Sequence, residues 1–256
     1  MATSGELIET VADILGISKA TVTTYYRSLR EAGLVTKSGR GPSAARMAAR
    51  DAALLLVAAG GSRFEKEPAE KIVRDFDRVR SFSNACRTQG PSTDSSQFQG
   101  DWIEGDGAWN MGGFEVPQLQ TLPTRHRVAD ALTALIEAMA PNAVLEAAGK
   151  LGPEYFFHRI GVSFFGPVPG ASIELDIYGS DMSFFHEEVG YQLVDLIDSK
   201  PRDFDQSKRS VRRKYGAGDL TIIRQFTNDT LLAVANLLKD ESSSTAEQNL
   251  RVPEGR

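Results

Sequence analysis

The sequence predicts a helix-rich α+β protein in which an N-terminal helix-turn-helix domain precedes a small α+β domain with two β-hairpins. Three observations predict this order. Apolar residues recur at helical spacing over residues 9–35, the apolar period changes to alternation after residue 155, and a segment rich in Gly, Ser, Gln and Pro lies between. The expected domains are a head, a helix with a long irregular linker, an α+β domain and a disordered tail, over residues 1–60, 61–123, 124–240 and 241–256.

Residues 9–35 predict two short helices joined by a tight turn. The apolar positions give each helix one face to bury against the other: Val11, Leu15, Ile17, Val22, Tyr25 and Leu29. Gly16 lies where the chain must turn sharply, and a glycine takes a positive φ at least cost. Ser18 is expected to cap the second helix and Gly33 to end it, while Ser4 is expected to cap the first.

The residues of the second helix that point away from this core are short, polar or basic. In a helix-turn-helix the first residues of the recognition helix lie against base edges in the major groove, and basic residues further along reach phosphates. The expected base readers are Lys19, Ala20, Thr23 and Thr24, beside Ser18 and Thr21 at the start of the helix. Arg27 and Arg30 are the expected phosphate contacts, and Lys37 is a further expected DNA-binding residue.

The run from Arg27 to Val35, followed by Thr-Lys-Ser-Gly-Arg-Gly at 36–41, resembles the end of a recognition helix leading into a β-wing. Bacterial winged-helix regulators of the MarR, GntR and IclR type have this arrangement, and the resemblance covers residues 6–42. It implies that Arg40, between two glycines, is the wing-tip residue that reaches the minor groove or the DNA backbone. The chain departs from the pattern after Pro42, because residues 42–51 continue into a helical pattern without a clear return strand.

Composition fits a basic head on an acidic body. Residues 1–50 carry seven Lys and Arg against four Asp and Glu, whereas the remainder carries 22 against 30. Such a head binds phosphates weakly by itself, so affinity is expected to come from pairing two heads in a dimer. No apolar run is long enough to span a membrane, no signal peptide is indicated, and the single cysteine, Cys86, fits a cytoplasmic protein.

The rest of the chain predicts further helices and strands. Residues 48–59 form a helix that is apolar nearly all round, buried in the head or in a dimer interface, and Gly60-Gly61-Ser62 ends it. An amphipathic helix runs from Pro68 to about Cys86. The irregular segment 87–123 holds Trp102 and Trp109, so part of it is expected to pack on a domain surface or a partner.

The C-terminal domain is expected to follow the order helix, two strands, helix, two strands, helix. The predicted elements are a helix at 124–140 capped by Thr124, a helix at 143–151, strands at 155–165 and 171–178, a helix at 187–199, a hairpin over 208–226 and a helix at 230–239. Glu174 and Asp176 alternate with apolar residues and are assigned to the solvent-facing side of their strand.

No enzyme signature, cofactor motif or metal-ligand spacing is present in the sequence. The three histidines, His126, His158 and His186, lie far apart and show no helical pairing. A second basic cluster comprises Lys208, Arg209, Arg212, Arg213 and Lys214. It is a candidate second DNA contact, a candidate site for an acidic partner, or the charged edge of a solvated strand.

These observations predict a bacterial or phage transcriptional regulator that binds double-stranded DNA as a homodimer. The α+β domain would supply pairing, ligand sensing or contacts to the transcription machinery. An alternative is a phage-type DNA-packaging or replication-initiation adaptor, in which a helix-turn-helix head sits on an oligomerising body. An enzyme with a DNA-targeting head is disfavoured because catalytic residues are missing.

Overall fold

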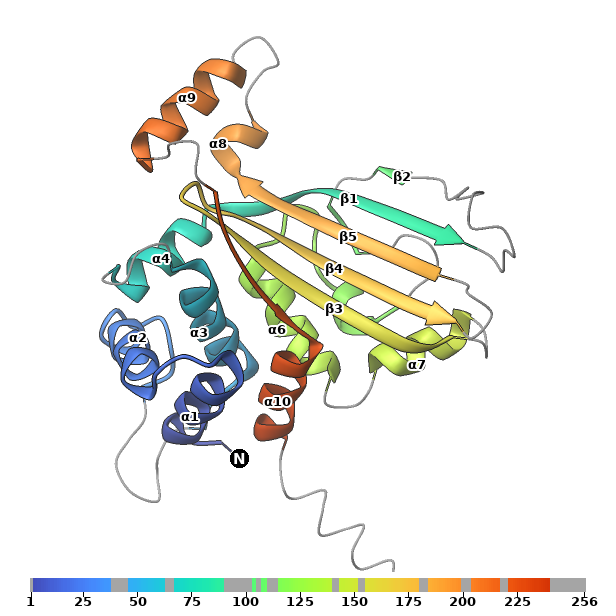
Figure 1. The fold of residues 1–256 in the computed structure, drawn as a ribbon, viewed down its shortest axis with the longest axis horizontal. Helices are drawn as coiled ribbons and strands as arrows, with labels where there is room; N and C mark the ends of the chain where they lie inside the picture. The colour runs from blue at the N-terminus through green and yellow to red at the C-terminus, as the bar shows by residue number, and fades with distance from the viewer. Residues whose placement is uncertain are drawn as a thin grey trace, which may run out of the picture.

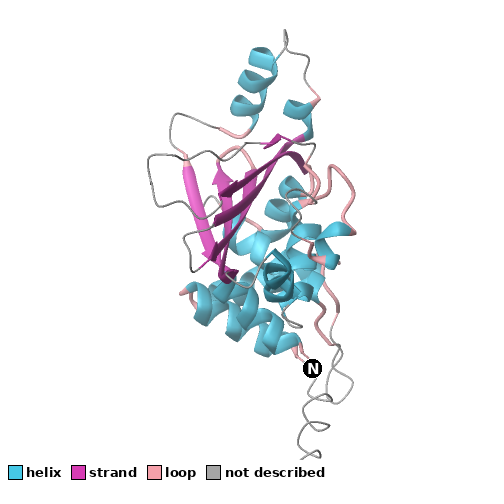
Figure 2. Cartoon of the chain, turned by 90° about the vertical axis from the view of Figure 1, so that its right-hand side faces the viewer, coloured by secondary structure: helices cyan, strands magenta, loops and turns pink. Residues whose placement is uncertain are grey.

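The computed structural model describes residues 2–37, 46–62, 67–89, 103–104, 107–109, 115–139, 143–151, 155–179, 184–198, 204–216 and 221–239. The fold is α+β, as predicted. One antiparallel sheet has the strand order β2 (Ile103–Glu104), β1 (Val79–Gln89), β5 (Phe184–Leu193), β4 (Gly170–Gly179), β3 (Tyr155–Gly166) and β6 (Ile222–Thr227). Helices gather on one side of this sheet (Figures 1 and 2).

The first two helices are α1 (Ser4–Leu15) and α2 (Lys19–Glu31), close to the predicted bounds. The predicted cap of α1 is wrong, because Thr3 rather than Ser4 occupies the N-cap position. Thr3 Oγ1 accepts from the backbone N–H of Glu6 at 3.3 Å, and the Glu6 carboxylate accepts from the backbone N–H of Thr3 at 2.7 Å. This reciprocal capping box needs a glutamate three residues after the cap, which Thr3 has and Ser4 lacks.

Helix α3 (Ala49–Gly61) is the central helix of the fold, buried without a break from Asp51 to Ala59. It packs on α2, on α4 (Ala69–Phe76), on α6 (Val128–Met139) and on β3. The helix includes Gly60 and Gly61 and ends at Gly61, with Ser62 as its C-cap, so it ends within the predicted Gly60-Gly61-Ser62 run. A Cβ on Gly60 would lie 2.5 Å from the Phe164 ring, so this glycine lets strand β3 approach the helix.

The predicted helix from Pro68 to Cys86 is wrong beyond residue 76. Helix α4 ends there and strand β1 begins at Val79, where the burial period changes from helical to alternating. Strand β1 pairs with β5, about a hundred residues later in the chain, from Val79↔Leu193 to Gln89↔Phe184. The predicted irregular segment 87–123 therefore begins with strand residues, and it also contains β2 and the short helix α5 (Pro117–Gln120).

Part of that segment packs on the body, as its aromatic content suggested. Trp109, Val116 and Leu119 are buried. The side-chain amide of Asn84 on β1 donates to the carbonyl of Ala108 at 2.8 Å and accepts from the N–H of Gly107 at 3.1 Å. Asn84 thereby fixes residues 107–109 to the sheet.

Helix α6 begins four residues later than predicted, at Val128. Arg125 has φ +59°, a left-handed conformation that no helical residue adopts, so Thr124 does not cap the helix. Helix α7 (Ala143–Leu151) and the β3–β4 hairpin match their predicted positions. The inward residues of β4, namely Ile173, Leu175 and Ile177, are buried against the helices.

The predicted helix at 187–199 is wrong. Residues 184–193 form β5, in which burial alternates strictly, and only Val194–Ile197 form a short helix, α8. Val189, Leu193, Val194 and Ile197 do fit a helical period, but Phe185, Val189, Tyr191 and Leu193 fit a period of two equally well. Pairing with β4, the preceding strand, and with β1, about a hundred residues earlier in the chain, decides for the strand.

The predicted hairpin at 208–226 is also wrong. Residues 204–214 form helix α9 (Phe204–Lys214), and β6 pairs with β3 instead of with a neighbour in sequence. Helix α10 (Asn228–Leu238) ends the described chain and packs on α1 and α6. The predicted tail at 241–256 lies outside the described residues.

One continuous apolar core joins the N-terminal helices to the sheet and its covering helices. Among the described residues, no helix is both long and apolar enough to cross a membrane.

Candidate nucleic-acid interface

The turn between α1 and α2 is fixed by backbone and side-chain hydrogen bonds. Gly16 has φ +63°, and the N–H of Ile17 donates to the carbonyl of Ala12 at 3.0 Å. Ser18 Oγ accepts from the N–H of Thr21 at 3.2 Å, which satisfies one free donor of the helix start as predicted. Gly33, with φ +71°, follows the end of α2. Helix α2 therefore has a defined start, a defined end and a fixed angle to α1.

One face of α2 is completely buried. Val22, Tyr25, Tyr26 and Leu29 are each less than 9% exposed, and Tyr25 donates its hydroxyl proton to Ser62 at 3.0 Å. Helix α2 packs on α1, α3 and α4 through this face. Because the four residues recur at helical spacing, the opposite face of the helix must point outward.

The outward face carries most of the residues that the sequence singled out. Ser18, Lys19, Ala20, Thr24, Arg27 and Arg30 are exposed, and Lys37 is exposed beyond the end of the helix. Thr21 and Thr23 are half-buried. Lys19, Thr23, Arg27 and Arg30 share one side of the helix, since they are three or four residues apart. We call these four residues the basic stripe.

The charges of the basic stripe are only partly neutralised. Lys19 Nζ lies 2.9 Å from Glu9 Oε1, but both side chains are more than half exposed, so this ion pair stabilises little and is easily exchanged. Arg27 and Arg30 make no ion pair with any residue that the structure describes. Two guanidinium groups on α2 are thus open to an anionic partner.

The threonines of α2 present methyl groups and hydroxyl oxygens. The Thr23 hydroxyl donates to the carbonyl of Lys19 at 2.6 Å, and the Thr24 hydroxyl donates to the carbonyl of Ala20 at 2.9 Å. Each oxygen keeps lone pairs that accept hydrogen bonds, and each methyl group can contact a thymine methyl. Both features suit contacts to base edges.

A hollow of about 730 Å³ separates the other side of α2 from α4. Its wall includes Thr21, Thr24 and Ser28 from α2, and Glu67 and Glu70 from the start of α4. Glu70 binds Ser28 through its carboxylate and, at 3.3 Å, through its backbone N–H. Thr21 and Thr24 thus face carboxylates, whereas the basic stripe lies on the side away from them, a division that no local pattern predicted.

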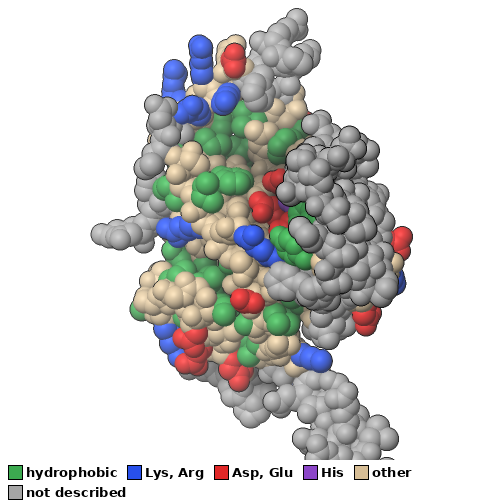
Figure 3. Space-filling model, turned by 45° about the vertical axis from the view of Figure 1, so that its right-hand side comes forward, with side chains coloured by type: hydrophobic (Ala, Val, Ile, Leu, Met, Phe, Trp, Pro, Cys, Tyr) green, Lys and Arg blue, Asp and Glu red, His purple; other side chains and the backbone are tan. Residues whose placement is uncertain are grey.

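Helix α9 contains the whole second basic cluster. Lys208, Arg209, Arg213 and Lys214 are exposed, Arg212 is half-buried, and Val211 is buried on the opposite side. The basic side chains of this helix stand at the top of the molecule in Figure 3. The charged strand edge that the sequence offered as one explanation is excluded, since these residues are helical.

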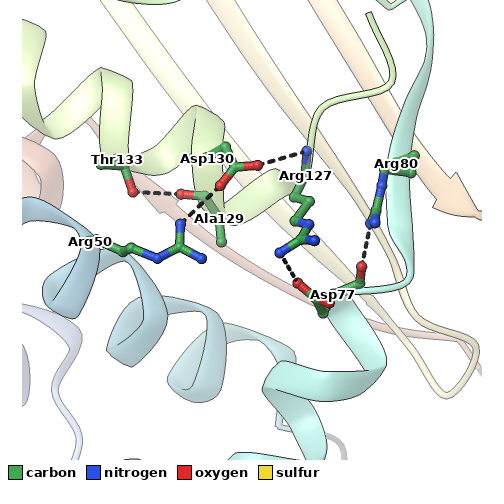
Figure 4. A network of polar contacts seen from close by, with 7 residues as sticks. All are labelled: Arg50, Asp77, Arg80, Arg127, Ala129, Asp130 and Thr133. Carbon is green, nitrogen blue, oxygen red and sulfur yellow. Dashed lines mark hydrogen bonds and ion pairs between the residues drawn. The ribbon is translucent and has the colours of Figure 1, made fainter. Parts of the chain in front are cut away.

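Arg40, the predicted wing-tip residue, and the rest of the predicted wing lie outside the described residues. Arg50, which adds to the positive charge of the first fifty residues, is already bound: its Nη1 lies 2.9 Å from Asp130 Oδ1 on α6 (Figure 4). Arg127 Nη1 lies 2.7 Å from Asp77 Oδ1, and the backbone carbonyl of Asp77 accepts from Arg80; Figure 4 shows both contacts. These contacts join α3, α6 and the start of β1, so Arg50 serves the fold.

A polar cluster on the face of the sheet opposite the helices was missed by sequence reasoning. His186 Nδ1 on β5 lies 2.7 Å from Asp176 Oδ1 on β4, and the hydrogen bond that His186 donates to this carboxylate raises the pKa of His186. Glu174 and Glu188 are the next cross-strand pair on the same face, and burial together with the Glu174 charge raises the pKa of Glu188. Figure 3 shows acidic side chains around a histidine on this face. The assignment of Asp176 to a solvated face is wrong, because it is only 7% exposed.

Two further observations concern catalysis and metals. His126 is buried; its Nε2 lies 2.8 Å from the Tyr191 hydroxyl and its Nδ1 lies 3.0 Å from the Pro123 carbonyl. Burial lowers the pKa of His126, so the ring is a neutral member of the core near neutral pH. Within the described ranges, no three His, Cys, Asp or Glu side chains come together as a metal site.

No protein-family model matches the chain, and no curated protein or solved structure is significantly similar to it.

Proposed function

We propose that the protein is a sequence-specific regulator of transcription that binds double-stranded DNA and reads the major groove with α2. The observation that carries this proposal is the division of α2 into a fully buried apolar face and an outward face with Arg27 and Arg30 unpaired among the described residues. A helix held from one side and exposed on the other can enter a groove about 12 Å wide without moving the rest of the protein.

The roles of the individual residues follow from their positions on α2. Lys19, Ala20 and Thr23 lie near its N-terminal end, where a recognition helix meets base edges. Arg27 and Arg30 lie one to two turns further on and would bind phosphates on either side of the groove. Ala20 and Thr24 are exposed and remain readers, but both border the hollow that Glu67 and Glu70 line, so bases are expected on the side of the basic stripe.

Two copies of the chain would bind together. A single head with few phosphate contacts gives only weak binding, and pairing two heads on one DNA raises the affinity without new contacts. Paired recognition helices fit half-sites about 34 Å, or one helical turn, apart. The sheet and its helices would provide the pairing surface, the contacts to the transcription machinery or the response to an effector.

The test is selection of bound sequences from a library of random and genomic duplexes. Enrichment of a near-palindromic motif is the expected result, and recovery of sequences without any common motif contradicts the proposal. The mass of the free protein in solution should correspond to a dimer. A particle of about eight or more subunits would favour a ring-forming DNA-packaging or replication adaptor instead.

A further inference from the structure

Helix α9 presents more unneutralised positive charge than any other described helix of the protein. Elsewhere Lys and Arg side chains are often bound to nearby carboxylates, as in the pairs Arg78–Asp195, Arg125–Asp198 and Arg127–Asp77. On α9, by contrast, Lys208, Arg209 and Arg213 make no ion pair within the described part of the chain. The only acidic residue of the helix is Asp205, in its first turn.

Helix α9 carries more basic residues than its own stability explains. Basic residues in the last turn stabilise a helix through its dipole, which accounts for Arg212, Arg213 and Lys214. It does not account for Arg209, which lies four residues before Arg213 on the same side, where two like charges repel. This pair lies opposite the buried Val211, at the outermost part of the helix.

The position of α9 relates it to α2. The hydroxyl oxygen of Tyr215, just beyond α9, lies 3.5 Å from Asp75 Oδ1 near the end of α4, and the start of α4 is bound to Ser28 of α2. Helices α9, α4 and α2 follow one another down the left side of the molecule in Figure 1. The eight residues of α4 span about 12 Å, so the points where α2 and the end of α9 meet α4 lie within one turn of a DNA duplex.

The surface between the two helices carries nearly balanced charge. Arg74 on α4 is exposed and makes no ion pair with a described residue. Lys71 Nζ lies 2.8 Å from Glu67 and 3.2 Å from Asp75, and the carboxylate of Glu70 binds Ser28. Since two cations stand against three carboxylates here, the positive charge for a polyanion lies at α2 and α9 and not on α4 between them.

We infer that α9 is a second contact to the same DNA, in which Arg209 and Arg213 bind backbone phosphates flanking the site that α2 reads. This inference rests on the proposed function, because it assumes that α2 holds the duplex. Phosphate contacts of this kind add affinity without adding sequence preference. They would add to the DNA affinity of the N-terminal helices, whose own excess of positive charge is small.

The test compares the wild type with the double variant Arg209→Gln/Arg213→Gln on the duplex that selection yields. Removing two phosphate contacts should lower the slope of log affinity against log salt by about two, so that the affinity lost between 50 and 200 mM salt shrinks about tenfold. The preferred motif should stay the same. A hydroxyl-radical footprint should lose protection on the flank of the motif while protection of the motif remains.

The matched control is Lys150→Gln/Arg159→Gln, which removes two exposed positive charges at the other end of the sheet. Its salt dependence and footprint should equal those of the wild type. Circular dichroism should show both variants folded, since all four side chains are exposed and Val211 is kept. If Arg209→Gln/Arg213→Gln binds its motif with wild-type slope and footprint, the inference is wrong and the proposed function stands. If the wild type selects no motif at all, both are wrong.

Discussion

His186 and Asp176 form a hydrogen-bonded pair across neighbouring strands, with 2.7 Å between Nδ1 and Oδ1, on the face of the sheet that the helices leave uncovered. The two side chains are 16% and 10% exposed, so water screens the interaction only weakly. The hydrogen bond raises the pKa of His186 in the folded protein above its ordinary value near 6.5.

The first prediction concerns the pH dependence of this pair. A raised pKa means that protonated His186 stabilises the fold; the contribution is complete below pH 6.5 and is lost as the pH rises through the folded-state pKa. Asp176→Asn should therefore cost about 1.5–3 kcal/mol of unfolding free energy at pH 5.5 and clearly less at pH 8.5. Urea unfolding at both pH values measures this difference.

The lowered pKa of the buried His126 also makes stability depend on pH, but equally in the wild type and in Asp176→Asn. It therefore cancels in the difference between their unfolding free energies. The double variant Asp176→Asn/His186→Gln provides a further control. It should show the same cost at both pH values relative to His186→Gln. A cost for Asp176→Asn alone that does not change with pH would mean that His186 carries no charge in the pair.

The second prediction concerns the neighbouring carboxylates. Glu174 and Glu188 are directly opposite each other on β4 and β5, and burial and the Glu174 charge raise the pKa of Glu188. The ionised form is disfavoured in the fold, so the penalty is present above the folded-state pKa and disappears below the unfolded-state value. Glu188→Gln should raise stability by about 0.2–1 kcal/mol at pH 7 and by less at pH 4. Glu146→Gln, in the exposed first turn of α7, removes a charge that favours the helix dipole, so it should not raise stability at either pH. Equal gains for Glu188→Gln at pH 7 and pH 4 would exclude charge repulsion.

Local sequence patterns correctly predicted the elements whose caps, turns and apolar period all lie within their own segment. Helix α2 has a cap, an apolar face and a terminal glycine within sixteen residues, and the β3–β4 hairpin has alternation on both sides of a short turn. The prediction at β5 was wrong because its apolar residues fit both the helical period and the period of two. The prediction at α9 was wrong because Val211 is the only residue of this helix that is buried among those described. The second half of the predicted helix at 68–86 was wrong because it forms strand β1, whose partner β5 lies about a hundred residues away.

The same reasons apply to the candidate site. The outward residues of α2 could be predicted, because the buried face of the helix fixes which side is exposed. The hollow beside Thr21 and Thr24 could not, because it depends on where α4 packs. The pairing of His186 with Asp176 was also out of reach, since a segment assigned to a helix offers no cross-strand neighbour.

The third prediction concerns the turn before α2. Gly16→Ala places a Cβ at φ +63° and should cost about 1–2 kcal/mol of stability, although no atom would be near the new methyl group. Gly149→Ala is the matched control, because this glycine also has open space around it but lies in helix α7, without a positive φ. It should stabilise the protein by up to about 1 kcal/mol. Thermal unfolding of both variants measures the effects, and similar values would exclude backbone strain at Gly16.

The fourth prediction concerns the packing of α3 on β3. A methyl group added at Gly60 would meet the Phe164 ring at 2.5 Å, so Gly60→Ala should cost about 1–3 kcal/mol through overpacking. In the double variant Gly60→Ala/Phe164→Leu, the smaller leucine should make room for the new methyl group. The double variant should therefore lose less stability than the sum of the two single variants. Denaturant unfolding of the single and double variants gives the coupling between them. Additive losses would show that the ring does not obstruct residue 60.

The last prediction separates affinity from sequence reading on α2. Arg27→Ala removes a guanidinium group assigned to a phosphate, so binding should weaken about equally on all duplexes and the salt slope should fall by about one. Thr23→Ala removes a group assigned to a base edge, so it should lower the preference for the selected motif by about 1–3 kcal/mol at one base pair while leaving the salt slope unchanged. Arg159→Ala is the matched control for lost charge, because Arg159 is exposed at the other end of the sheet, away from α2 and α9. If Arg27→Ala and Arg159→Ala have the same effect, the basic stripe does not contact DNA, and if Thr23→Ala keeps the full preference, the bases are read by other residues of the helix.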